Sequence, residues 1–274
     1  MGIFSVISLL GGLSIFLYGM DIMGDGLKSS SSKALKSMLE KVTHSAVLGM
    51  LTGTLVTSVI QSSTATIVLT VGLLSAGILN LRQSISIVMG ANIGTTVTAQ
   101  IIRLMDINSS GAAFIEIFKP STLAPLAVLC GIILLKFVKS QKTKGIGMML
   151  MGFGILFTGL MGMTEAVSPL SESQAFTDVL QKFSDVPILG ILTGLITTFI
   201  VQSSSAVIGM VQALSSTGAF TFQTVYPLII GINLGTCITT AIVCSIGTDK
   251  DAKRTGIAHI LFNCIGTVLF MAAK

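Results

Sequence analysis

Hydrophobic residues along the chain gather into eight segments, which short polar stretches separate. Most segments are close to the ~20 apolar residues that a helix needs to cross the roughly 30 Å hydrocarbon core of a bilayer. The pattern therefore predicts an all-α membrane protein. The segments cover residues 3–23, 46–79, 84–103, 122–138, 145–163, 187–219, 223–246 and 256–273.

Two of these segments do not fit a single crossing. Segments 46–79 and 187–219 each exceed 30 residues, which is too long for one span and too short for two. Gln-Ser-Ser interrupts each near its middle and leaves arms of about 13–16 residues, or ~20–24 Å of helix. We expect each segment to form a re-entrant helical hairpin that enters and leaves the membrane on one face.

The Gln-Ser-Ser interruptions belong to an internal duplication. Residues 48–65 and 189–206 are identical at 10 of 18 positions, at an offset of 141. The same offset places the motif Gly-x-Asn-x-Gly-Thr-x-x-Thr of residues 90–98 on residues 231–239. The duplication predicts two repeats, residues 1–140 and residues 141–274, each with a span, a hairpin and two further spans.

Charge supports the hairpins and sets the topology. Apolar residues make up 51% of the chain and charged residues 10%, against about 25% in soluble domains. With two hairpins, 12 of the 16 Lys and Arg residues fall on one face, which the positive-inside rule makes cytoplasmic. A single crossing by segment 46–79 would separate the Lys-rich loops 24–46 and 136–145. The net charge of +5 therefore reflects membrane topology and not a nucleic-acid partner.

Three crossings then separate the starts of the two repeats, so the second repeat is inverted relative to the first. The two hairpin tips approach each other near the middle of the bilayer, as in many secondary transporters. The predicted fold is two inverted-topology repeats, each with a re-entrant hairpin and a broken transmembrane helix.

The hairpin tips are the predicted anion site. Ser and Thr cap helix N-termini, and an N-terminus offers free N–H groups and about half a positive charge. Hydroxyls that bond within their own helices are the alternative, which we favour for an isolated Ser but not for a duplicated cluster. The predicted anion ligands are Gln61, Ser62, Ser63, Thr64, Gln202, Ser203, Ser204 and Ser205.

The Asn-x-Gly-Thr motifs form a second constellation, midway along segments 84–103 and 223–246. Gly and Asn favour a local helix break, and the exposed oxygens would suit a small hard cation such as Na⁺. A glycine-lined crossing between packed helices is the alternative. The predicted cation ligands are Asn92, Thr95, Thr96, Asn233, Thr236, Thr57 and Thr198.

Other polar residues have structural interpretations. Segment 24–46 suits an amphipathic interfacial helix that residues 29–32, all Ser, would cap. His259 is more often a structural hydrogen-bonding residue than a proton relay. The four Cys residues lie in apolar segments without metal-ligand spacing and are expected to pack. No Walker A motif or catalytic triad is present, so an enzyme is not predicted.

At the paired Gln-Ser-Ser and Gly-x-Asn-x-Gly-Thr motifs, the chain resembles the bacterial branch of the type II sodium–phosphate cotransporter family. The resemblance runs from Gly11 to Asn263. It implies alternating-access transport of inorganic phosphate driven by Na⁺ in the cell membrane, in a homodimer. The family signature falls on residues 61–63 and 202–204, and Thr64 replaces the Ser often seen next to it.

Two other functions fit the same residues. The anion could be sulfate or a dicarboxylate instead of phosphate. A non-transporting membrane scaffold or phosphate sensor would bind phosphate without accumulating it.

Overall fold

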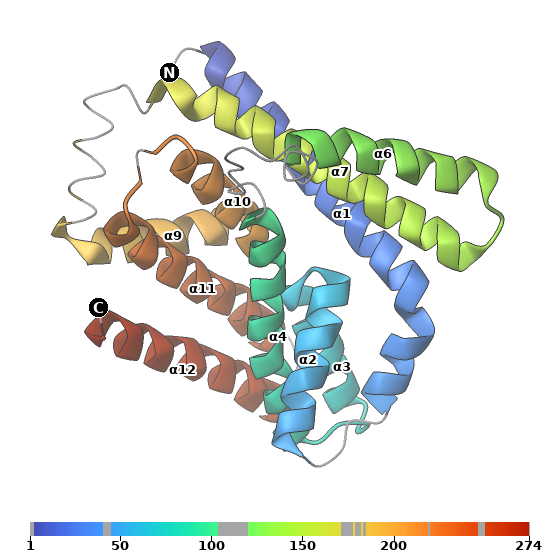
Figure 1. The fold of residues 1–274 in the computed structure, drawn as a ribbon. Coiled ribbons are helices and arrows are strands. Elements are labelled where there is room, and N and C mark those ends of the chain that lie inside the picture. The colour runs from blue at the N-terminus through green and yellow to red at the C-terminus, as the bar shows by residue number, and fades with distance from the viewer. Residues whose placement is uncertain are drawn as a thin grey trace. The chain divides into compact units, whose positions relative to one another are not determined.

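The computed structural model describes residues 3–40, 45–103, 120–170, 178, 182, 185–218, 220–245 and 250–273. Within these ranges the chain forms ten α-helices and one short 3-10 helix, with no strand, so the predicted all-α class is confirmed (Figure 1). The helices are α1 (Ile3–Glu40), α2 (Ala46–Ile60), α3 (Ser63–Ser75), α4 (Leu81–Ile102), α6 (Pro120–Phe137), α7 (Gln141–Val167), η2 (Ser168–Leu170), α9 (Pro187–Val201), α10 (Ser204–Ser215), α11 (Phe222–Ser245) and α12 (Lys250–Ala272).

Five helices in the described ranges are long and apolar enough to cross a membrane: α4, α7, α11, α12 and residues Ile3–Ser30 of α1. Large apolar side chains cover their outer faces, and Val268 and Phe270 of α12 remain 68% and 63% exposed. Such a surface requires lipid and not water around it. The protein is therefore a multi-pass membrane protein. The predicted span 122–138 corresponds to α6, which is shorter than these five.

The chain divides into two compact units, and each takes segments from both sequence repeats. Unit 1 contains Met1–Ser32, Ala99–Leu180 and Ile208–Thr221, and unit 2 contains Lys33–Thr98, Gln181–Val207 and Phe222–Lys274. The compact units are therefore not the repeats themselves. The repeat boundary at residue 140 stays a prediction from the sequence.

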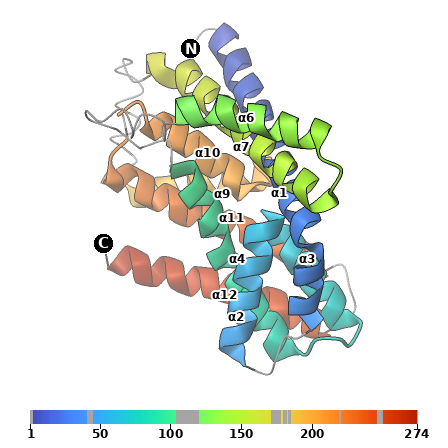
Figure 2. The ribbon, with the colours of Figure 1, turned by 45° about the vertical axis from the view of Figure 1, so that its right-hand side comes forward.

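In unit 1, α1 and α7 cross where glycines of one helix contact the backbone of the other. A Cβ on Gly12 would lie 2.8 Å from the nitrogen of Met163, and one on Gly19 would lie 2.9 Å from the carbonyl oxygen of Gly152. Such distances leave no room for a side chain, which is how small residues bring membrane helices together. In Figure 2, α6 and α7 lie side by side on either side of a short turn.

In unit 2, the long helices α4 and α11 each pack against the first arm of a helical hairpin. Gly94 of α4 faces Thr57 of α2, and a Cβ on that glycine would lie 2.6 Å from the Cβ of Thr57. Gly235 of α11 faces Thr198 of α9 with the same distance of 2.6 Å. The duplicated sequence therefore builds the same helix crossing twice. The last helix, α12, packs against α11 and α3.

The helix breaks predicted in segments 84–103 and 223–246 are wrong. Helices α4 and α11 run without interruption through both Asn-x-Gly-Thr motifs. A glycine inside a helix costs only about 1 kcal/mol, and close packing against a neighbouring helix offsets that cost. The alternative, a glycine-lined crossing between packed helices, is what the structure contains.

The capping role predicted for residues 29–32 is also wrong. Helix α1 is continuous from Ile3 to Glu40, so no second helix begins at these serines. The hydroxyl of Ser30 donates to the carbonyl oxygen of Gly26 at 2.8 Å, four residues earlier. A Ser whose hydroxyl bonds to its own helix in this way lets the helix continue. The run of four serines gave no sign of this in the sequence.

The glycine crossing predicts opposite effects for two Gly-to-Ala changes in unit 2. Gly94→Ala should destabilise the protein by about 1–3 kcal/mol, because the new methyl group meets the carbonyl oxygen of Thr54 at 2.7 Å as well as Thr57. Gly72→Ala in α3 has no atom of the described chain within 4 Å and should stabilise the helix by up to ~1 kcal/mol. Thermal unfolding in detergent measures both, and equal midpoints would contradict this packing.

Candidate ion-binding site

Two short loops of equal geometry interrupt the helical hairpins. Helix α2 ends before Gln61 and α9 ends before Gln202, and both glutamines adopt the left-handed conformation with φ of 58°. Within the described chain they are the only residues other than glycine with positive φ. Their N–H groups donate to the carbonyls of Thr57 and Thr198 at 2.7 and 2.8 Å. A left-handed glutamine costs about 1–2 kcal/mol, so its side chain must have a use that glycine cannot supply.

Each glutamine side chain holds its loop in place with both ends of its amide. Gln61 donates from Nε2 to the carbonyl of Ser58, and its Oε1 accepts from the hydroxyl of Thr98 at 2.8 Å. Gln202 repeats the arrangement. Its Nε2 donates to the carbonyl of Phe199, and its Oε1 accepts from the hydroxyl of Thr239 at 3.2 Å. The glutamines therefore connect each loop to the long helix beside it.

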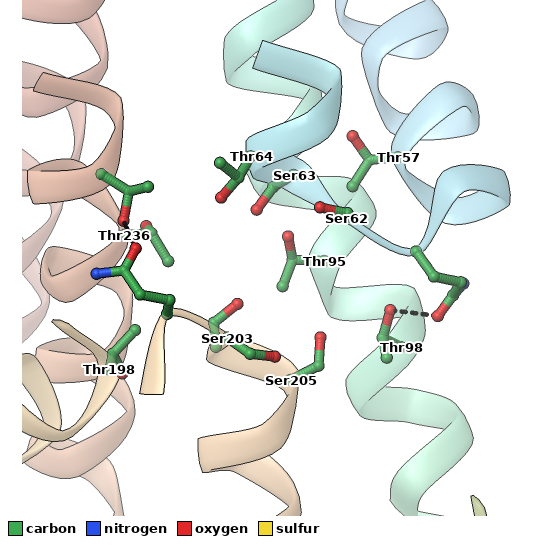
Figure 3. Close-up of a pocket in the computed structure, with 14 residues that line it drawn as sticks. Thr57, Ser62, Ser63, Thr64, Thr95, Thr98, Thr198, Ser203, Ser205 and Thr236 are labelled. Atoms are coloured by element: carbon green, nitrogen blue, oxygen red, sulfur yellow. Dashed lines mark hydrogen bonds between the residues drawn. The ribbon is translucent and has the colours of Figure 1, made fainter. Parts of the chain in front are cut away.

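The second arm of each hairpin starts with a serine cap. The hydroxyl of Ser62 accepts from the N–H of Ala65 at 3.2 Å, and that of Ser203 accepts from the N–H of Ala206 at 3.3 Å. In the view of Figure 3, α3 rises from its loop and α10 descends from the other. The N-termini of α3 and α10 therefore lie beside the same space within unit 2.

A cavity of about 50 Å³ lies between these two loops (Figure 3). A single water needs roughly 10–15 Å³ on this measure, so the cavity suits a small ion with its ligands and not a large metabolite. Only Ser, Thr and Gln residues line it, and none carries a charge. The lining residues form seven pairs at the 141-residue offset: Thr57 and Thr198, Gln61 and Gln202, Ser62 and Ser203, Ser63 and Ser204, Thr64 and Ser205, Thr95 and Thr236, and Thr98 and Thr239.

Helix dipoles give this uncharged cavity two kinds of surface. The N-termini of α3 and α10 carry partial positive charge and free N–H groups, which favour an anion. The C-terminal ends of α2 and α9 carry partial negative charge, which favours a cation. Thr57 and Thr198 lie in the last turns of those two helices. A surface that favours an anion and one that favours a cation therefore line the same small cavity.

The structure brings most of the sequence-predicted ligands together. All eight predicted anion ligands line the cavity, and so do Thr57, Thr95, Thr198 and Thr236 from the cation set. The other three predicted cation ligands, Asn92, Thr96 and Asn233, do not line it. Thr98 and Thr239 line it without having been predicted, although both belong to the duplicated motif.

Asn92 takes part in a different polar contact. Its Oδ1 lies 2.9 Å from Nε2 of His259, which is 1% exposed. Since the amide oxygen accepts, the imidazole donates from Nε2. The Nδ2 of Asn92 and the Nδ1 of His259 are buried and make no hydrogen bond in the described chain. This contact links α12 to α4, in agreement with the structural role expected for His259.

Comparison with known proteins matches both halves of the chain to one family. The Na⁺/Pi-cotransporter family matches residues 15–165 and again residues 161–274, so each match covers about one copy of the duplicated sequence. Comparison with solved structures gives no match.

Related proteins occur in bacteria and mammals. YqeW of Bacillus subtilis (strain 168), whose name gives no function, is 29% identical over 257 residues, 93% of this chain and 78% of that protein. YjbB of Escherichia coli (strain K12), whose name proposes export of inorganic phosphate, is 24% identical over 97% of this chain. The chain spans 46% of the length of YjbB.

A mammalian relative shares a shorter region. The human sodium-dependent phosphate transport protein 2B is 34% identical over 108 residues, which is 39% of this chain and 16% of that protein. The two family matches together extend over most of the chain. The chain therefore belongs to the Na⁺/Pi-cotransporter family, a family of transporters and not of enzymes.

Proposed function

We propose that this protein is a secondary active transporter that couples Na⁺ entry to the movement of inorganic phosphate. The observation that carries the proposal is the uncharged cavity where two helix N-termini and two helix C-termini meet. Family membership supports phosphate and Na⁺ as its ions.

The phosphate would lie against the N-termini of α3 and α10. A tetrahedral oxyanion can accept there from backbone N–H groups and from hydroxyls, without a Lys or Arg side chain. The proposed ligands are Ser62, Ser63, Thr64, Ser203, Ser204 and Ser205. Gln61 and Gln202 would act by holding the loops, because both ends of each amide already have partners in the protein.

A cation in the same cavity would compensate the charge of phosphate. Two helix N-termini supply about one positive charge between them, which is less than a divalent anion in a low-dielectric site requires. Thr57, Thr95, Thr198 and Thr236 line the cavity and offer oxygen ligands to Na⁺. Ligand roles are not proposed for Asn92, Thr96 and Asn233, because these residues do not line the cavity and their predicted role depended on broken helices.

Alternating access would follow from inverted repeats. The four hairpin arms contain 12 to 15 residues, or about 18–22 Å of helix, which is less than the hydrocarbon thickness. We propose that they are re-entrant, with the cavity near the middle of the bilayer. The name of YjbB makes outward phosphate movement as relevant as uptake. The homodimer implied by the family resemblance stays a prediction.

The cavity volume bears on the alternative anions. About 50 Å³ suits a compact tetrahedral ion better than a dicarboxylate. Sulfate has the same shape as phosphate, so competition against labelled phosphate is the measurement that separates them. A sensor would bind phosphate in detergent but would not accumulate it in sealed liposomes.

Replacing the cap serines should abolish most phosphate transport. Ser62→Ala and Ser203→Ala each remove a hydroxyl from the cavity, and we expect at least about a tenfold loss of uptake into proteoliposomes. Ser62→Gly removes the same hydroxyl, but glycine replaces serine as an N-cap at a cost of only tenths of a kcal/mol. This variant therefore separates loss of the hydroxyl ligand from loss of helix stability. Ser14→Ala is the control, since that hydroxyl lies outside the cavity and donates to the carbonyl of Leu10 in its own helix at 2.8 Å. Wild-type uptake by Ser62→Gly and Ser203→Ala would remove these residues from the site.

Transport should depend on Na⁺. An inward Na⁺ gradient should accelerate uptake of labelled phosphate into proteoliposomes, because phosphate needs a compensating cation in the cavity. Replacement of Na⁺ by choline, without a proton gradient, should reduce uptake to the level of empty liposomes. Undiminished uptake in choline would contradict Na⁺ coupling.

A further inference from the structure

The two halves of the cavity differ at one buried hydroxyl. Thr57 and Thr198 are 1% and 2% exposed, and each lies four residues before its loop glutamine. The hydroxyl of Thr57 donates to that of Thr66 at 3.0 Å. The hydroxyl of Thr198 is buried and has no hydrogen-bond partner within the described chain.

The sequence explains this difference. The residue nine positions after Thr57 is Thr66, whereas the residue nine positions after Thr198 is Val207. The backbone is otherwise equivalent, because the N–H of Thr66 donates to Ser62 at 3.1 Å and that of Val207 donates to Ser203 at 3.2 Å. Val207 therefore occupies the place of Thr66 but offers no oxygen to accept the Thr198 proton.

The difference concerns the hydroxyl proton and not only the oxygen. The hydroxyl of Thr57 donates to the hydroxyl of Thr66, and the hydroxyl of Thr66 donates to the carbonyl of Ser62 at 3.0 Å. Within the described chain, the hydroxyl of Thr198 uses neither its proton nor its lone pairs in a hydrogen bond. A buried hydroxyl without a partner is uncommon in native proteins, and an ion or a water bound at that position is one explanation.

The position of Thr198 allows two ligands at once. It lies in the last turn of α9, where the helix dipole favours a cation near the hydroxyl oxygen. It also lines the cavity with Ser203 and Ser204, where the N-terminus of α10 favours an anion. A single hydroxyl there can donate to a phosphate oxygen while a lone pair contacts Na⁺.

We infer that Thr198, and not its counterpart Thr57, bridges the two transported ions and contributes to their coupling. The inference rests on the proposed function and deepens it. The two sequence repeats then contribute unequally: the first supplies a hydroxyl fixed by the protein, and the second supplies one that the ions themselves satisfy. Phosphate binding should depend on Na⁺ through this residue.

Variants at position 207 test the inference without removing any cavity residue. Val207→Thr keeps the shape of the side chain and offers Thr198 the acceptor that Thr57 has. We expect the apparent KM for phosphate to rise about tenfold at high Na⁺, the effect of losing one hydrogen bond to a charged group, and its dependence on Na⁺ to flatten. Val207→Ile changes the same position without adding a hydroxyl and is the matched control.

Variants at position 198 complete the test. Thr198→Val should reproduce the effect of Val207→Thr, and Thr198→Ser should keep the wild-type dependence on Na⁺ because it keeps the hydroxyl. The measurement is initial phosphate uptake into proteoliposomes at several Na⁺ concentrations. Wild-type behaviour of Val207→Thr, or of Thr198→Val, would overturn the inference and leave Thr198 bonded to water only. Uptake by the wild-type protein that does not respond to Na⁺ would instead overturn the proposed function.

Discussion

The four helix ends at the two loops must satisfy their backbone groups within the protein, and the rest of this structure depends on how that is done. At each hairpin loop, one glutamine takes the left-handed conformation, caps a carbonyl of the helix that ends, and accepts from a threonine of a neighbouring long helix. A serine then caps the helix that begins. The Gln-Ser sequence thus provides hydrogen-bond partners for backbone groups at the ends of these helices. The cavity is the space that this arrangement leaves between the two loops.

The same backbone geometry supplies the electrostatics. Helices that begin beside the cavity present donors, and helices that end beside it present acceptors, so the wall has one surface that favours an anion and another that favours a cation. Fixed charges would bind one ion strongly and hinder its release. Partial charges on peptide groups bind moderately, which suits a transporter that must also let its ions leave.

Much of this could be predicted from the sequence because the duplication made it visible. Polar residues in the middle of two long apolar segments marked the loops, and their offset predicted which residues would pair across the cavity. The role of Gly94 and Gly235 could not be predicted from the sequence, since a glycine that breaks a helix and one that makes room for a neighbouring helix are the same residue. Only the position of Thr57 and Thr198 against those glycines distinguishes the two. Thr98 and Thr239 belonged to the repeated motif, but their bonds to the loop glutamines required three-dimensional structure.

The absence of ionisable groups from the cavity wall has a consequence for experiments on acidity. Ser, Thr and Gln side chains do not titrate in the physiological range, so the wall presents the same donors and acceptors in acidic and alkaline media. Inorganic phosphate, the anion proposed for this cavity, gains and loses a proton in that range. If phosphate binds there, acidification changes the protonation state of the ion and not that of the side chains that line the cavity.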